Sequence, residues 1–536
     1  MSGANRSDGE LNSKHKINTD STGFIAKSGS MGNQPVKDSF RNTKWRWAAL
    51  FFGCFFLLGS YFWYDNPNSL SDQLSKHVTN GSDFKYNQLY SVYSYPNIIL
   101  PLLGGVLIDK FGLPFSIYLF STLLVIGQGV FTVSGFLGIN AEDGAIYPFI
   151  IAIIGRVIFG LGGESLSVCQ STIISRWFVG KELSLALGIN ISVSRLGSVF
   201  NNYSMPPFAE ATNLGWALFF GFVLCIISFI CGAILTWFEK YANKIDNEDG
   251  GLKDDEKEEF HWSDIKEFSM SFWLIAANWV FTYIGLFCFN NISNDFFAAR
   301  YGMSQQNSAR ITSNVFLISA FLAPIFGVIS DKIGHKVTFC IVSTTSLAMW
   351  HALFIILPYS TEENVSYIGV IPIVGLGITY SIYVAALWPM IPLVVKPQVV
   401  GSAFGLCTAL QNIGLALGPI MVSLLTDTKK GEDGILRDGT NRNGFIWVNV
   451  ALGSFALLGL LCSFALLYSD RVYYKGLLQK PSSSSEEEYV DITTTPTQAH
   501  NPRNLAEQNS DLREYTANKG LRNKMKRSMA RSSMAK

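Results

Sequence analysis

Charge is scarce in this sequence, and neither sign dominates. Charged residues make up 15% of the 536 residues, and the formal net charge is +1. Such a chain presents no overall electrostatic field that would attract nucleic acid or another polyanion. Only the stretch from Lys524 to Lys536 is locally basic. We therefore expect no nucleic-acid partner.

The sequence also lacks the motifs of the common enzyme classes. It contains no Walker loop to hold nucleotide phosphates, no HExxH pair to bind zinc, and no nucleophile elbow with suitable partners. The glycines from Gly160 to Gly163 imitate a phosphate-binding loop, but they lie in an apolar helix, where close helix packing explains them. The eight cysteines form no CxxC pair and fall within apolar segments, which is typical of small core residues. We expect no enzyme activity, no cofactor and no metal site.

Long apolar runs are what the sequence has in abundance. Apolar residues make up 49% of the chain and charged residues only 15%, whereas soluble proteins carry about 25% charged residues. A run of about 20 such residues crosses a bilayer as a helix. Six runs precede a charged stretch and six follow it: residues 45–64, 88–108, 115–138, 147–175, 184–206, 214–238, 270–292, 307–330, 337–358, 366–392, 400–426 and 444–468. The prediction is an all-α integral membrane protein with twelve transmembrane helices in two pseudo-symmetric halves.

These spans divide the chain into five parts. We expect a disordered cytosolic tail at 1–43, a six-helix half at 44–239, a cytosolic linker at 240–269, a second six-helix half at 270–469 and a disordered cytosolic tail at 470–536. The first apolar run starts too late for a cleavable signal peptide and is expected to insert as an anchor. Lysines after spans 2, 6 and 8 favour a cytosolic position for both termini: Lys110, Lys240, Lys332 and Lys336. Basic residues after span 11 oppose this bias, which is modest.

Short motifs in the loops and tails predict modification and sorting. Asn80 and Asn364 begin glycosylation sequons in loops that this topology places on the lumenal or external side. A third sequon, at Asn190, lies inside a span and shows that such triplets also occur by chance. In the C-terminal tail, Tyr489 and Ile492 form a tyrosine-based motif of the endolysosomal sorting type, and a plain disordered segment is the alternative.

One motif occurs twice, each time directly after an apolar run. The copies are Gly105-Val-Leu-Ile-Asp109-Lys-Phe-Gly112 and Gly327-Val-Ile-Ser-Asp331-Lys-Ile-Gly334. Their glycines allow close helix approach, and we interpret Asp109 and Asp331 as gate residues that bond helix ends and release during rocking. Twelve spans with this motif after spans 2 and 8 resemble the major facilitator superfamily. The resemblance implies a two-domain transporter that works by alternating access.

Five further segments resemble one lysosomal branch of this superfamily. They are Gly59-Ser-Tyr-Phe-Trp-Tyr-Asp65-Asn-Pro67, Gly162-Gly-Glu164-Ser-Leu, Ser194-Arg195-Leu-Gly-Ser198, Ala386-Leu-Trp388-Pro-Met and Gln411-Asn412-Ile-Gly414. The similarity covers residues 45–470 and leaves out the tails. It implies a lysosomal exporter of dipeptides that works as a uniporter, with a heavily glycosylated lysosomal membrane protein as accessory subunit.

Glu164 in span 4 and Arg195 in span 5 are charged residues at intermediate depth in the membrane. A charge near the bilayer centre costs several kcal/mol unless it is paired or faces a polar cavity. Arginine can hold a carboxylate with two parallel hydrogen bonds, and glutamate can accept from an ammonium. The two residues therefore fit the two ends of a zwitterion such as a dipeptide. The alternative is that they pair with each other and hold spans 4 and 5 together.

Aromatic and amide residues in other spans are further candidates for a substrate cavity. Trp388, before a proline in span 10, is predicted to be a cavity wall or gate, and a lipid-facing tryptophan is the alternative. The remaining candidates are polar or aromatic side chains within the spans: Tyr64, Tyr95, Asn290, Gln411 and Asn412. Arg156 lies in the first half of span 4, whereas Glu164 lies past its middle. We expect Arg156 to bond neighbouring helix backbone or to pack near a gate.

The sequence leaves the energy source and the solute class open. No central span except the fourth carries an Asp or Glu at mid-depth, so no carboxylate relay for protons is evident. Proton coupling stays an alternative, because Glu164 could titrate if its partner moves away. A sugar or organic anion would require Arg195 and not Glu164. From another class, a membrane receptor or scaffold would bind a ligand without turnover.

Overall fold

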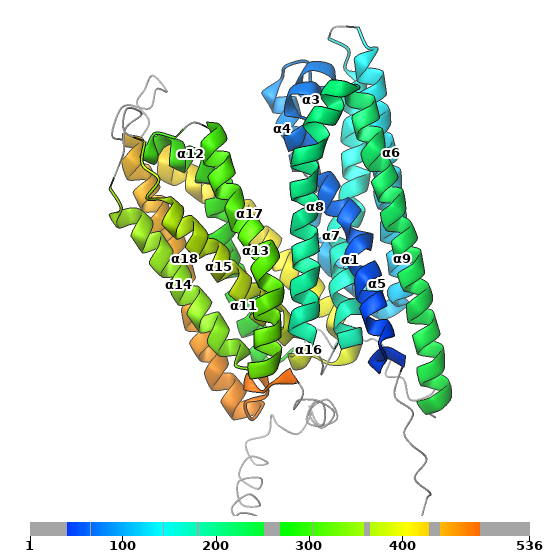
Figure 1. The fold of residues 1–536 in the computed structure, drawn as a ribbon, viewed down its shortest axis with the longest axis vertical. Helices are drawn as coiled ribbons and strands as arrows, with labels where there is room; N and C mark the ends of the chain where they lie inside the picture. The colour runs from blue at the N-terminus through cyan, green and yellow to red at the C-terminus, as the bar shows by residue number, and fades with distance from the viewer. Residues whose placement is uncertain are drawn as a thin grey trace, which may run out of the picture. The chain divides into compact units, whose positions relative to one another are not determined.

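The computed structural model describes residues 40–482, apart from residues 65, 143, 179–181, 251–267, 304, 359–364 and 428–439. Every regular element within these ranges is a helix (Figure 1). The sorting residues Tyr489 and Ile492 and the sequon at Asn364 lie outside the described residues.

The N-terminal half contains the first six spans. Their helices are α1 (Trp45–Tyr64), α4 (Asp83–Ser94) with η2 (Pro96–Ile98) and α5 (Leu100–Phe111), α6 (Leu113–Ile139), α7 (Tyr147–Phe178), α8 (Leu183–Ala211) and α9 (Leu214–Gly250). The short helices are η1 (Phe40–Asn42), α2 (Asn66–Ser69) and α3 (Ser71–His77). α6 packs along α7 and α9, and α1 packs against α8 and α9 (Figure 1). Because α9 continues to Gly250, the first residues of the predicted linker are helical.

The C-terminal half contains the other six spans. Its elements are α11 (Met270–Tyr283), the π-helix η4 (Ile284–Cys288), α12 (Phe289–Tyr301), α13 (Gln305–Ile333), α14 (Lys336–Ile356), α15 (Val370–Leu387), η5 (Trp388–Met390), α16 (Ile391–Val394), η6 (Pro397–Val399), α17 (Val400–Asp427), α18 (Thr440–Tyr473) and η7 (Leu477–Gln479). α14 packs between α15 and α18, α13 packs along α15, and α11 packs along α18.

Eleven helical segments of the described chain are long and apolar enough to cross a membrane. The second predicted span, at 88–108, is not among them, so the expectation of one continuous helix there was wrong. α4 ends at Ser94, and Pro96 has no N–H to bond back along a helix. Beyond the break, the side-chain amide of Asn97 donates to the carbonyl oxygen of Tyr93, near the end of α4, at 2.8 Å. The second span is therefore built from two helices joined by η2.

Span 7 also departs from a regular α-helix. The π-helix η4 widens one turn in its middle, a feature that leaves carbonyl groups without their usual helical partners. The Nε2 atom of His351 lies 3.1 Å from the carbonyl oxygen of Gly285 in this turn, and its Nδ1 atom lies 3.0 Å from Oδ1 of Asn449. The buried histidine thus links α14, α18 and η4 by hydrogen bonds and supports the turn that carries Phe287.

The two halves meet along two matching helix pairs. α5 of the N-terminal half packs against α17 of the C-terminal half, and α8 packs against α13. Each pair contains one copy of the repeated motif, since the first copy lies in α5 and the second lies in α13. We call the end of the bundle that carries both copies the motif end.

Candidate functional site

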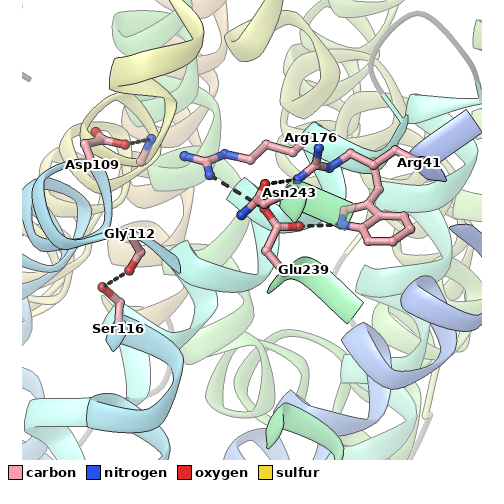
Figure 2. A network of polar contacts seen from close by, with 9 residues as sticks. Arg41, Asp109, Gly112, Ser116, Arg176, Glu239 and Asn243 are labelled. Carbon is pink, nitrogen blue, oxygen red and sulfur yellow. Dashed lines mark hydrogen bonds and ion pairs between the residues drawn. The ribbon is translucent and has the colours of Figure 1, made fainter. Parts of the chain in front are cut away.

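The two motif aspartates form equivalent contacts across the halves. The carboxylate of Asp109 accepts from the backbone N–H of Gly401 at 3.0 Å and of Ser402 at 2.5 Å, at the start of α17. Figure 2 shows Asp109 with a hydrogen bond to its carboxylate. The carboxylate of Asp331 accepts from the N–H of Ser184 at 3.0 Å and of Leu185 at 2.8 Å, at the start of α8. The first N–H groups of a helix lack internal partners and carry partial positive charge. Each aspartate therefore caps a helix of the opposite half; we call these contacts the first and second latch.

The motif glycines allow the backbones at the latches to approach closely. A Cβ atom on Gly105 would overlap the carbonyl oxygen of Gly401, and one on Gly327 would lie 2.6 Å from the carbonyl oxygen of Ser184. No real side chain fits at such separations. Glycine at both positions is thus a condition for the latches to close.

A buried glutamate organises the motif end of the N-terminal half. Glu239 is only 1% exposed, and it accepts from Nη2 of Arg41 at 3.1 Å and from the indole N–H of Trp177 at 2.8 Å. Arg176 lies 3.8 Å from the same carboxylate, on the side of Asp109 (Figure 2). Sequence reasoning missed this network, because Arg41 fell in the predicted tail and Glu239 at the predicted end of span 6.

Glu164 and Arg195 face partners other than each other. Oε1 of Glu164 accepts from the hydroxyl of Tyr93 at 3.3 Å, within the N-terminal half. The guanidinium of Arg195 donates to the hydroxyl of Tyr380, in the C-terminal half, at 2.9 Å. No ion pair joins Glu164 to Arg195 in the part of the chain that the structure describes. The alternative in which the two residues form a helix-pairing salt bridge is therefore not what this conformation shows.

Aromatic rings of the C-terminal half surround the guanidinium of Arg195. Its central carbon lies 4.5 Å from the ring centre of Phe316, 5.4 Å from that of Phe287 and 5.7 Å from that of Tyr380. These faces attract a cation without neutralising it. Arg195 thus keeps its charge available for an anionic group while it bridges the two halves.

Trp388 lies inside the C-terminal half, in contact with other aromatic residues. Its ring centre is 4.6 Å from that of Trp279, and its N–H donates to the hydroxyl of Tyr283 at 3.2 Å. The N–H of Trp279 donates in turn to Oε1 of Gln411 at 2.6 Å. The lipid-facing alternative for Trp388 is therefore wrong, and Trp388 and Gln411 belong to one connected cluster.

The remaining candidate residues differ in how close they lie to Glu164 and to the aromatic cluster around Trp388. Asn412 donates to the carbonyl oxygen of Asn97 at 2.7 Å and so ties α17 to the break in span 2. Tyr64 packs against Tyr93, with 5.1 Å between ring centres. Tyr95 is 66% exposed at the same break, and Asn290 lies half-buried in α12. The structure places Tyr64 beside the partner of Glu164, and it does not bring Tyr95 or Asn290 into the cluster around Trp388.

Arg156 is buried against helix backbone. Its Nε donates to the carbonyl oxygen of Leu89 at 3.0 Å, and its Nη1 donates to that of Trp63 at 3.4 Å. The guanidinium also lies over the ring of Tyr93. Because the side chain is only 2% exposed, Arg156 holds α1, α4 and α7 together and indirectly places the tyrosine that bonds Glu164.

Replacement of Arg156 by lysine is expected to destabilise the N-terminal half. Lysine keeps the charge but cannot reach two carbonyl groups with a planar fork, and a lost hydrogen bond to a charged group costs about 1.5–3 kcal/mol. We expect the midpoint of thermal unfolding in detergent to fall by about 2–3 °C, because the entropy of unfolding of so long a chain is large. The exposed Arg310→Lys is the matched control, and equal midpoints for the two variants would contradict this role.

The partners of Glu164 and Arg195 were largely invisible in the sequence. Tyr93, Tyr380, Phe287 and Phe316 are aromatic residues in a chain that contains 40 phenylalanines and 21 tyrosines. The one signal in the sequence is the four-residue spacing of Tyr283 and Phe287, which places them one helical turn apart. In the structure their rings stack with centres 5.0 Å apart. Nothing in the sequence identifies which of these faces meets an arginine from the other half.

The sequon at Asn80 lies at an accessible turn. Asn80 is exposed and adopts a left-handed backbone conformation with φ of 53°. Its side-chain amide donates to the carbonyl oxygen of Ala145 at 3.0 Å. A glycan on this nitrogen would replace one of its two hydrogens and leave one N–H as a donor.

Two six-helix halves, latched at one end by helix-capping carboxylates and sharing a charged and aromatic region between them, are the architecture of a two-domain membrane transporter. The family model of the Major Facilitator Superfamily matches residues 76–419 and 279–499. The chain belongs to this superfamily, and it is a multi-pass membrane transporter rather than an enzyme.

Curated relatives agree with this assignment. The chain is 32% identical to "Lysosomal dipeptide transporter MFSD1" of Bos taurus over 82% of this chain and 89% of that protein. It is 34% identical to the Homo sapiens protein of the same name, over 70% of this chain and 79% of the relative. A Bacillus subtilis hexuronate transporter is 22% identical over 75% of this chain and 88% of that protein.

Solved structures show the same fold at low identity. The proton:xylose symporter XylE bound to a bromodeoxyglucose matches with a TM-score of 0.57 and 12% identity, over 78% of this chain and 95% of XylE. A double-tryptophan mutant of XylE matches with a TM-score of 0.62 and 14% identity, over 84% and 99% of the two chains. The predicted twelve-span, two-half architecture is thereby confirmed.

Proposed function

We propose that this protein exports dipeptides across the lysosomal membrane to the cytosol as a uniporter, by alternating access. The observation that carries the proposal is the separation of Glu164 and Arg195, each of which is held by a tyrosine hydroxyl and not by the other. Two opposite charges kept apart in one membrane region are suited to a zwitterionic solute. The relatives named lysosomal dipeptide transporters support the solute and the compartment.

The chemistry of recognition follows from the two side chains. The guanidinium of Arg195 binds the dipeptide carboxylate through parallel hydrogen bonds, and the carboxylate of Glu164 accepts from the terminal ammonium. The hydroxyls of Tyr93 and Tyr380 keep both groups partnered when no solute is bound. Trp388, supported by Trp279 and Tyr283, forms a wall near Arg195, since Tyr283 and Tyr380 have ring centres 6.3 Å apart.

Alternating access requires the latches to open. Closure of the motif end depends on Asp109 and Asp331, which bond N–H groups of the opposite half. When the halves rock, these bonds break and the motif end admits water to the solute. A carboxylate bound to Arg195 influences the rocking of the halves, because Arg195 belongs to the N-terminal half and the aromatic rings around its guanidinium belong to the C-terminal half.

The proposal includes a membrane topology and protein partners. Both termini and the connection between the two halves lie in the cytosol. The predicted boundary of the C-terminal tail at 470 was wrong, because α18 continues to Tyr473 and the chain as far as Ser482 packs on the C-terminal half. Asn80 and Asn364 then face the lumen and carry glycans. A heavily glycosylated lysosomal membrane protein serves as accessory subunit, and Tyr489 and Ile492 direct sorting.

Counterflow into liposomes tests the transport function. Purified protein is reconstituted with unlabelled dipeptide inside, and uptake of a labelled dipeptide is followed with and without a pH gradient. We expect uptake that unlabelled dipeptides compete and sugars do not, at a rate that a proton gradient does not drive. Absence of uptake by well-folded protein would favour a receptor or scaffold, and uphill uptake driven by protons would overturn uniport.

A second candidate solute is an organic anion. The similarity to a hexuronate transporter favours it, because a hexuronate carries a carboxylate for Arg195 but no ammonium for Glu164. Uptake into the same liposomes distinguishes a dipeptide from an organic anion as the solute. Competition by hexuronates and retention of uptake in Glu164→Gln would support the anion, whereas competition by dipeptides and loss of uptake in that variant would support the zwitterion.

A further inference from the structure

The chain that follows the last span folds back onto the C-terminal half. α18 ends at Tyr473, and Gly476 turns the backbone in a left-handed conformation with φ of 77°. The N–H of Leu478 then donates to Oδ1 of the buried Asp470 at 3.0 Å, and the side chains of Leu477 and Leu478 are buried. We call residues 477–482 the strap.

The middle of the strap is bound to the connection between α13 and α14. The N–H of His335 donates to the carbonyl oxygen of Gln479 at 2.9 Å. Oε1 of Gln479 also accepts from the hydroxyl of Thr338 at 3.3 Å. A Cβ atom on Gly334, whose φ is 75°, would lie 2.5 Å from the carbonyl oxygen of Gln479. The last glycine of the second motif copy thus makes room for the strap, and the backbone contacts define its register.

The end of the strap reaches the second latch. The hydroxyl of Ser482 donates to Oδ1 of Asp331 at 2.8 Å, the same oxygen that accepts from the N–H of Ser184. The ammonium of Lys336 lies 3.5 Å from the Ser482 hydroxyl. Asp331, Lys336 and Ser482 are all buried. The latch carboxylate is therefore held from its own half as well as from the opposite half.

We propose that the strap sets the strength of the second latch, with Ser482 as the positioning residue for Asp331. The strap is bonded to α18 and to the connection between α13 and α14, so it moves with Asp331 and not with α8. A hydroxyl on one carboxylate oxygen fixes the rotation of the carboxylate, so that both oxygens point at the N–H groups of Ser184 and Leu185. The C-terminal segment thereby controls how readily the motif end opens, whatever the solute.

The test measures the opening of the motif end directly and does not depend on the solute. Spin labels replace the exposed Lys110 and Lys332 in the two motif copies, in full-length protein in lipid nanodiscs, on a background in which the half-buried Cys231 and Cys462 are serine. The distance distribution between the labels gives the ratio of closed to open molecules. The variants compared are Ser482→Ala, Ser482→Thr, Ser454→Ala and Asp331→Asn.

Ser482→Ala is expected to shift the ratio of closed to open molecules about tenfold toward the open form, the effect of losing one hydrogen bond to a charged group. Ser482→Thr, which keeps the hydroxyl, should restore the wild-type ratio. Ser454→Ala removes a hydroxyl that bonds only its own helix, to the carbonyl of Val450, and should leave the ratio unchanged. In the Asp331→Asn background, Ser482→Ala should add no further shift.

Two results would overturn the strap's role. The first is an unchanged distance distribution in Ser482→Ala when its unfolding midpoint matches that of Ser482→Thr. The second is a shift of equal size with and without Asp331→Asn, which would place the effect of Ser482 outside the latch.

Discussion

Arg195→Ala is expected to lower dipeptide counterflow by about 100-fold or more. The substitution removes up to two charge-assisted hydrogen bonds to the solute carboxylate, each of which contributes about 1.5–3 kcal/mol. It also leaves the carboxylate of the dipeptide without a counter-charge inside the membrane. The measurement is initial uptake of labelled dipeptide into liposomes, normalised to the amount of reconstituted protein.

Glu164→Gln should lower the same uptake by about 10-fold to 100-fold, because a neutral amide loses the charge that attracts the ammonium. An N-acetylated dipeptide, which lacks the ammonium, should compete poorly with the wild type and should be affected less by Glu164→Gln. This comparison separates an effect on recognition from a loss of folding.

Conservative variants control for the structural contacts of the two residues. Tyr380→Phe removes the hydroxyl that bonds Arg195 but keeps the aromatic face, so uptake should fall only a few-fold. Arg195→Lys keeps the charge without the planar fork and should lie between the wild type and Arg195→Ala. Full uptake by Arg195→Ala would refute the proposed role of the arginine as carboxylate anchor.

Asp331→Asn is expected to slow the transport cycle about tenfold while the dissociation constant of the dipeptide changes less than about threefold. The carboxylate accepts two N–H groups at the start of α8, whereas an asparagine offers one acceptor and turns an NH2 group toward the other N–H. The closed motif end then loses a charge-assisted bond and the favourable interaction with the helix N-terminus. Solute binding is spared because the latch does not touch Glu164 or Arg195.

Two measurements on each variant separate these effects. Exchange in liposomes gives the maximal rate, and quenching of tryptophan fluorescence by dipeptide gives the dissociation constant. Asp109→Asn at the first latch should behave in the same way, because its two N–H partners are equivalent. A loss of affinity that matches the loss of rate would contradict a gating role for either aspartate.

Parts of the candidate site could be predicted because they follow from the cost of placing charge in a bilayer. Glu164, Arg195 and Arg156 stood out in the sequence as charges within apolar runs, and Asp109 and Asp331 as repeats. The break in span 2 was not predicted, because 88–108 is apolar enough on average and a proline inside an apolar run can either kink a helix or end it, depending on the packing around it. The strap was hidden within a segment whose composition resembles that of a disordered tail.

The sequence by itself determined the number of spans, their division into two halves and the position of both motif copies, because hydrophobic length and short repeats are local properties of the chain. Only the tertiary structure decided that Arg195 enters an aromatic cage of the opposite half, that Glu164 takes Tyr93 as its partner, and that Ser482 reaches Asp331. Each of these contacts joins residues 71 to 185 positions apart in the chain. Such contacts depend on how whole helices pack, and no local pattern of residue types encodes the choice between chemically equivalent partners.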